Sequence, residues 1–134
     1  MVEDELKSLK SEFIVSADVS KAKISEYIRR IMQFCKVAEN GAVIIENEKL
    51  TNREKIIVSL IARFLANKIE SGIPSDVSAE ELSDYLLIPK NQILARLKEA
   101  VDEKLAIRVE RGIYKINPTK IEKFLEILEN KYGG

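Results

Sequence analysis

The stretch SAEELSDYLLIPKNQILARL, residues 78–97, predicts two short helices separated by a tight turn. Ser78 and Glu81 have the spacing of a capping box, in which the serine hydroxyl accepts a backbone N–H and the carboxylate reaches back to the helix start. The run Leu87-Ile88-Pro89 interrupts the apolar spacing, and its proline suits the first turn of a new helix because no N–H is needed there. The stretch therefore predicts a helix, a turn and a second helix that covers residues 89–104.

The flanking sequence extends this pair of helices on both sides. Upstream, Thr51 and Glu54 form a second capping box. Apolar residues then recur every three or four positions as far as Ile69, which predicts a long amphipathic helix. Downstream, residues 106–117 alternate apolar and polar side chains around a glycine, which predicts a β-hairpin. Residues 118–134 begin with proline and carry one apolar stripe, which predicts a C-terminal helix.

Residues 1–50 form an N-terminal extension outside this pattern. From Ser20 the apolar spacing predicts an amphipathic helix that continues to Cys35. Asn40-Gly41 is a turn signal because both residues tolerate a positive φ, and the apolar run Ala42–Ile45 after it predicts a short strand. The extension is therefore expected to contain a helix and a small hairpin across the Asn40-Gly41 turn.

From Thr51 the expected order is a long helix, an extended link at Asp76-Val77, a helix, a turn, a helix and a hairpin. This order resembles the winged helix-turn-helix family, and in particular its prokaryotic or archaeal regulators. The residues that carry the resemblance are Ala79, Leu82, Ile88, Pro89, Ile93, Leu97, Leu105, Gly112, Tyr114, Lys115 and Ile116. The resemblance covers residues 51–117 and implies an α+β fold, mainly helical, with a small β-hairpin as the wing.

The resemblance also implies a function, which is to bind double-stranded DNA as a transcription regulator. In such proteins the second helix lies in the major groove and the wing contacts the backbone or the minor groove. The candidate DNA-binding residues are Lys90, Asn91, Gln92, Arg96 and Lys98 on the second helix and Arg108, Arg111 and Lys115 on the hairpin. Asn and Gln can pair with adenine and Arg with guanine, so the chemistry for reading bases is present.

The distribution of charge leaves a second interpretation open. The chain has 22 basic and 22 acidic residues, so its net charge does not favour a nucleic-acid partner. Residues 87–98 nevertheless contain three basic residues and no acidic one, whereas acids gather on the preceding helix. Leu94 falls where recognition helices commonly place a polar residue. The alternative is therefore a protein-interaction module, an adaptor subunit of a larger nucleic-acid-processing assembly that contacts its partner at Leu94.

The apolar stripe of the C-terminal helix must be covered by another surface. The stripe consists of Ile121, Phe124, Leu125 and Leu128. It either packs on the long helix of the same chain or pairs with a second copy. We favour the homodimer, because a two-fold axis would present two recognition helices to a palindromic DNA site.

The composition argues against an enzyme or a metalloprotein. The chain has no histidine, which excludes Ser-His and Cys-His nucleophile pairs. Its one cysteine, Cys35, lies on an apolar helix face and cannot form an internal disulfide or a zinc site. We expect no catalytic residue, no metal and no cofactor. The charged N-terminus lacks a secretory apolar segment, and no run approaches the ~18 apolar residues of a membrane span, so a cytoplasmic protein is expected.

Overall fold

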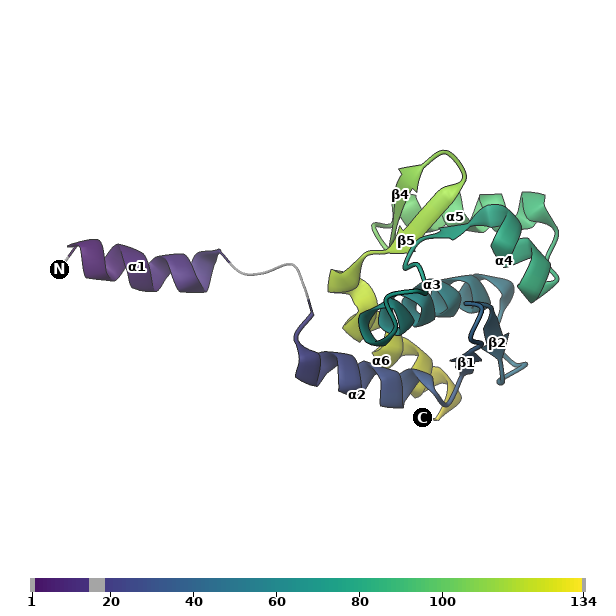
Figure 1. Cartoon of the computed structure of the whole chain (residues 1–134), viewed down its shortest axis with the longest axis horizontal. Coiled ribbons are helices and arrows are strands. Elements are labelled where there is room, and N and C mark those ends of the chain that lie inside the picture. The colour runs from purple at the N-terminus through teal and green to yellow at the C-terminus, as the bar shows by residue number, and fades with distance from the viewer. Residues whose placement is uncertain (1, 15–18, 134) are drawn as a thin grey trace.

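The computed structural model describes residues 2–14 and 19–133, and within them the chain is a mixed α/β fold with two small antiparallel sheets (Figure 1). The helices are α1 (Val2–Phe13), α2 (Lys21–Ile31), α3 (Asn52–Ile69), α4 (Ala79–Leu86), α5 (Lys90–Asp102) and α6 (Ile121–Tyr132), with a 3-10 turn, η1 (Pro118–Lys120), before α6. The strands are β1 (Cys35–Val37), β2 (Val43–Ile45), β3 (Val77–Ser78), β4 (Ala106–Glu110) and β5 (Ile113–Ile116). None of the helices in the described ranges is long and apolar enough to cross a membrane.

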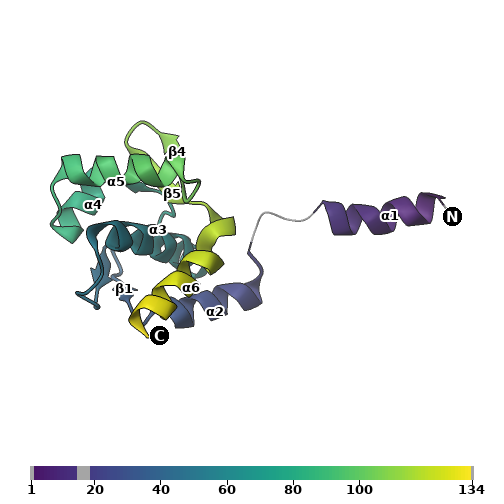
Figure 2. The ribbon, with the colours of Figure 1, turned by 180° about the vertical axis from the view of Figure 1, so that it is seen from behind.

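Helix α3 lies at the centre of the fold, and the remaining elements apart from α1 surround it. Helices α2 and α6 lie on one side of it, and α4, α5 and the β4–β5 hairpin lie on the other (Figures 1 and 2). The capping box at its start is confirmed: the Thr51 hydroxyl accepts the N–H of Glu54 at 3.1 Å, and the Glu54 carboxylate accepts the N–H of Thr51 at 2.8 Å. Every residue from Ile56 to Ala66 is buried, so α3 contacts neighbours on all sides.

The buried residues of α3 include Arg63, whose side chain is only 3% exposed. Its guanidinium donates hydrogen bonds to the backbone carbonyls of Gly41 (3.3 Å), Pro74 (2.8 Å) and Asp76 (3.2 Å), and it forms an ion pair with Glu81 on α4. One side chain therefore joins the central helix to two loops and to α4. A buried guanidinium is stable only when its donors are satisfied, as they are here.

The second sheet has the strand order β3-β5-β4. Val77 pairs with Tyr114, so the extended link after α3 is joined to the hairpin. The N–H of Ala79 also donates to the carbonyl of Gly112 at 2.9 Å, so the start of α4 is joined to the turn of the hairpin. Gly112 has a φ of +77°, a conformation that favours glycine at this turn. The hairpin is thus held against the first residue of α4.

The N-terminal hairpin is confirmed, but the helix before it is shorter than expected. Strands β1 and β2 pair across the Asn40-Gly41 turn, with Cys35 opposite Ile45. Helix α2 ends at Ile31, so the prediction that it continues to Cys35 is wrong. Strand pairing overrides the helical spacing at this point, since Cys35 lies opposite Ile45 in the sheet. Burial raises the pKa of the Cys35 thiol to about 12, in keeping with the expected role as a core residue.

The C-terminal stripe is buried within its own chain, so the predicted homodimer through these residues needs a correction. Ile121, Phe124, Leu125 and Leu128 are each no more than 3% exposed. Helix α6 contacts α2, where Arg30 donates to the Glu129 carboxylate at distances of 2.7 to 3.2 Å, and it contacts the start of α3, where Lys131 and Tyr132 donate to Glu54. These four residues belong to the hydrophobic core of their own chain, so the stripe is not available to a second copy.

The ionised side chain of Glu54 is expected to stabilise the fold above about pH 4.5. Burial raises its pKa, but hydrogen bonds from Lys131 (2.8 Å), the Tyr132 hydroxyl (2.5 Å) and the N–H of Thr51 outweigh burial, and the pKa lies below the usual 4.5. The stabilisation by the ionised Glu54 carboxylate is therefore complete above the pKa that Glu54 has in the unfolded chain. It is lost as the pH falls through the lower pKa that Glu54 has in the folded protein. In urea titrations, Glu54→Gln should lose less of its stability than the wild type between about pH 5 and pH 3.

The matched control for this measurement is Glu126→Gln, which alters an exposed glutamate of α6. Its urea midpoint should follow that of the wild type over the same pH range. Equal acid sensitivity in the wild type and in Glu54→Gln would show that Glu54 does not contribute in this way.

Candidate functional site

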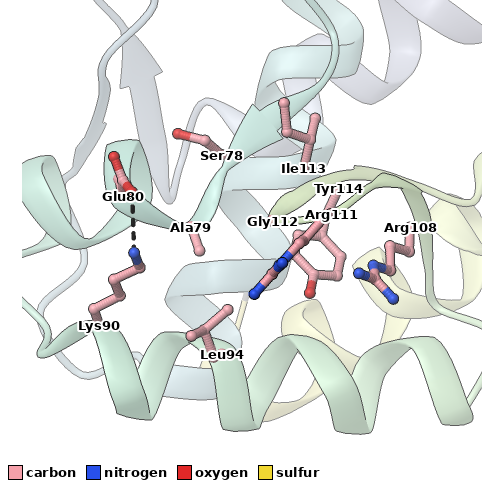
Figure 3. Close-up of a pocket in the computed structure, with 10 residues that line it drawn as sticks. All are labelled: Ser78, Ala79, Glu80, Lys90, Leu94, Arg108, Arg111, Gly112, Ile113 and Tyr114. Carbon is pink, nitrogen blue, oxygen red and sulfur yellow. Dashed lines mark hydrogen bonds and ion pairs between the residues drawn. The ribbon is translucent and has the colours of Figure 1, made fainter.

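A groove with a volume of about 590 Å³ separates α5 from the β4–β5 hairpin (Figure 3). Helix α5 forms one wall, the hairpin forms the other, and the junction of β3 with α4 closes one end. The groove is lined by Ser78, Ala79, Glu80, Lys90, Leu94, Arg108, Arg111, Gly112, Ile113 and Tyr114. Three of the eight residues predicted as a DNA-binding set meet here: Lys90, Arg108 and Arg111.

The turn before α5 has the geometry that the sequence predicted. Leu87 ends α4 in a left-handed conformation, with φ 58° and ψ 40°, and the Ser83 hydroxyl donates to the carbonyl of Ile88 at 2.6 Å. The carbonyl of Pro89 accepts the N–H of Ile93 at 3.1 Å, so α5 starts at Lys90, one residue later than expected. The helix also ends at Asp102, before the predicted limit of residue 104.

The capping box predicted at the start of α4 is formed only in part. The Ser78 hydroxyl accepts the N–H of Glu81 at 3.0 Å, as expected. The Glu81 carboxylate forms its ion pair with Arg63. The glutamate therefore joins α4 to α3, a role that the local spacing did not indicate.

The burial of α5 determines which of its side chains face the groove. Ile93, Leu97 and Ala100 are buried against the core. Lys90 and Leu94, four residues apart, lie on the neighbouring face and line the groove. Lys98 is exposed and continues the same row by one turn.

The charges in the groove are mostly basic, but one acid lies among them. Lys90 forms an ion pair with Glu80 of α4 at 3.0 Å, and both side chains are more than half exposed (Figure 3). Arg108 and Arg111 are exposed and form no ion pair with any residue in the described ranges. Both guanidiniums are thus free to meet an anion from solvent. The sequence placed Glu80 among the acids of the preceding helix and did not indicate this ion pair. The distance between Glu80 and Lys90 depends on how α4 and α5 cross, which the sequence alone does not give.

The remaining predicted residues of α5 lie outside the groove. Asn91 and Gln92 are exposed, and neither lines it. Arg96 forms an ion pair with Glu99 at 2.9 Å, and its Nε atom is buried without a hydrogen-bond partner among the described residues. Arg96 is therefore held partly against the protein surface, in contrast to the arginines of the hairpin.

Lys115 lies on the opposite face of the hairpin from Arg108. Side chains alternate across a strand, and Lys115 pairs with Ile107 whereas Arg108 pairs with Tyr114. Lys115 and Ile107 line a different pocket, next to Phe64 of α3. A β-bulge between Arg108 and Glu110 also breaks the predicted alternation of β4, and Ile107 and Val109 are both exposed.

The groove also has an apolar part, which sequence reasoning recognised only in Leu94. The Leu94 side chain is 37% exposed. Ala79 and Ile113 line the same space, and the largely buried Tyr114 lies between the two walls (Figure 3). Strand pairing brings Ile113 and Tyr114 there, because β5 is held between β3 and β4.

In the part of the chain that the structure describes, no group of three or more His, Cys, Asp or Glu side chains is arranged to hold a metal ion. Comparisons with protein-family models, curated proteins and solved structures found no match to this chain. A function for this chain is therefore inferred from the geometry and charge of the groove.

Proposed function

We propose that this chain is a winged helix-turn-helix protein that binds double-stranded DNA and regulates transcription. In this proposal α4 and α5 are the helix-turn-helix, and the β4–β5 hairpin is the wing. The observation that carries it is the pair of exposed guanidiniums of Arg108 and Arg111, which line the same groove as Lys90. A planar guanidinium can donate two parallel hydrogen bonds to one phosphate, which suits this pair to a nucleic-acid backbone.

The exposed face of α5 would enter the major groove of the duplex, which is wide enough for one helix. Asn91 near its N-terminus can donate to and accept from adenine, and Ala95 can contact a thymine methyl group. Lys98 would approach a phosphate, and Arg111 at the tip of the wing would reach the backbone or the minor groove. Lys90 would exchange Glu80 for a phosphate at small cost, since exposed ion pairs contribute about 0–1 kcal/mol.

The proposal is tested by titrating the protein into labelled duplexes of random sequence and following fluorescence anisotropy. Lys90, Lys98, Arg108 and Arg111 are the cations that would meet phosphates. The logarithm of the association constant should therefore fall with the logarithm of salt concentration with a slope of roughly −3 to −4. Absence of binding to any duplex at about 50 mM salt would overturn the proposal.

The exposure of Leu94 favours a second candidate function. An apolar side chain beside Ala79 and Ile113 can accept a side chain of a partner protein, as in an adaptor subunit of a nucleic-acid-processing assembly. This alternative predicts that the protein does not bind duplex DNA. It also predicts that the protein binds a partner protein and that the Leu94→Glu variant does not. Duplex binding that is retained in Leu94→Ser and obeys the salt dependence above would support the first function.

A further inference from the structure

Helix α1 has an apolar stripe that no other part of the described chain buries. Val2, Leu6, Leu9 and Phe13 are 67%, 58%, 48% and 89% exposed. They follow one another at intervals of four, three and four residues, which is the spacing of d, a, d and a positions in a heptad repeat. No residue of α1 is buried, and the helix lies apart from the other elements in both views (Figures 1 and 2).

A helix of this kind needs a partner for its stripe. Isolated helices shorter than about 12–15 residues are marginal in water, and most helix stability in proteins comes from packing of an amphipathic face. This alternation of four and three residues places the stripe along one narrow line, which suits a second helix of the same repeat. We propose that the α1 helices of two copies of this chain associate as a parallel two-stranded coiled coil.

The charges beside the stripe favour the parallel orientation. With Leu6 at an a position, Glu5 is at g and Lys10 is at the following e position. In a parallel pair, the g residue of one helix faces the next e residue of the other, so Glu5 meets Lys10 of the second copy on both sides. In an antiparallel pair, g faces g and e faces e. Glu5 would then face Glu12, and this repulsion would offset the attraction between Glu3 and Lys10.

The proposed interface is separate from the groove and from α6. It would join two copies through the N-terminal helix α1, whereas the apolar stripe of α6, near the C-terminus, is buried. None of its residues lines the groove, so association through α1 can be tested independently of DNA binding. If the α1 dimer and the proposed DNA binding are both correct, the dimer presents two copies of α5 to one duplex.

The first experiment measures the mass of the full chain by sedimentation equilibrium over a range of micromolar concentrations. The wild type should be a dimer that dissociates on dilution. Leu6→Lys with Leu9→Lys should be a monomer, because charges at a and d positions face the partner helix. The control, Ser8→Lys with Ser11→Lys, adds the same charge at outward positions and should still form the dimer. All these residues are exposed, so the remaining fold is unaffected.

The second experiment tests the orientation by exchanging charges. Glu5→Lys and Lys10→Glu should each weaken the homodimer roughly tenfold, since two attractive pairs become repulsive in each. The chain that carries both substitutions should regain the wild-type dissociation constant, and an equal mixture of the two single variants should form heterodimers. In an antiparallel pair, Glu5→Lys would face Glu12 and strengthen association, which would overturn the parallel arrangement.

A third variant, Leu9→Cys, should form a disulfide between two copies under oxidising conditions, because equivalent d positions face each other only in the parallel pair. The native Cys35 is buried, so the wild type should remain uncrosslinked. A wild-type protein that is monomeric at every concentration would overturn the proposal.

Discussion

Replacing Arg63 with methionine should lower the free energy of unfolding by about 3 to 5 kcal/mol. The substitution removes the donors for three backbone carbonyls and leaves the Glu81 carboxylate without its cation. Unsatisfied carbonyls cost free energy because they have lost water without gaining a partner. A typical domain has about 5–15 kcal/mol of stability in total, so the loss should be plain in a urea titration followed by circular dichroism.

Arg30→Met is the matched control for this prediction. Arg30 also forms ion pairs with glutamates, but its side chain is 18% exposed against 3% for Arg63, and among the described residues its guanidinium hydrogen-bonds only to carboxylates and to no backbone carbonyl. Ion pairs that water reaches contribute little, so this variant should lose about 1 kcal/mol. Equal losses in the two variants would contradict the central role of Arg63.

A double variant isolates the charge that Arg63 balances. Arg63→Met leaves an unpaired carboxylate at Glu81, and adding Glu81→Gln removes that charge. The double variant should therefore be more stable than Arg63→Met alone, although the three carbonyls remain unsatisfied. The result separates the ion pair from the hydrogen bonds to the backbone.

If the chain binds duplex DNA as we propose, replacing Arg108 and Arg111 together with glutamate should weaken that binding by about 100-fold. Each substitution removes a cation from the groove and places an anion near the phosphates. Two fewer phosphate contacts should also reduce the magnitude of the salt slope by about 2. Both side chains are exposed, so the urea midpoint should stay near that of the wild type. Anisotropy titrations at several salt concentrations measure both quantities.

The matched control is the pair Lys21→Glu and Lys123→Glu, which changes the net charge by the same amount. These exposed lysines lie on α2 and α6, on the other side of α3 from the groove (Figure 1). Charges separated by more than about 10 Å are screened at ordinary salt, so the control should lose less than about threefold in affinity. A similar loss in both pairs would mean that net charge governs binding rather than the groove.

Much of the local structure could be predicted from sequence because its causes act over a few residues. The capping box at Thr51, the turn at Leu87-Ile88-Pro89 and the hairpin around Gly112 are each formed by neighbours in the chain. The spacing of Ile93, Leu97 and Ala100 along α5 is also local, and these three residues are buried. The end of α2 was not predictable in this way, because Cys35 continues the helical spacing but is paired in a strand with Ile45.

The candidate site was predictable only in part. The sequence by itself determined which residues are basic and which elements carry them, and it placed Lys90, Arg108 and Arg111 in one set. The tertiary structure decided that these three share a groove, that Glu80 enters it and that Lys115 faces away.

The burial of Arg63 and the packing of α6 on α2 were likewise decided by the tertiary structure. The reason is physical. Caps, turns and periodicity depend on residues within about one helical turn, whereas the distance between two charges on different elements depends on how those elements pack.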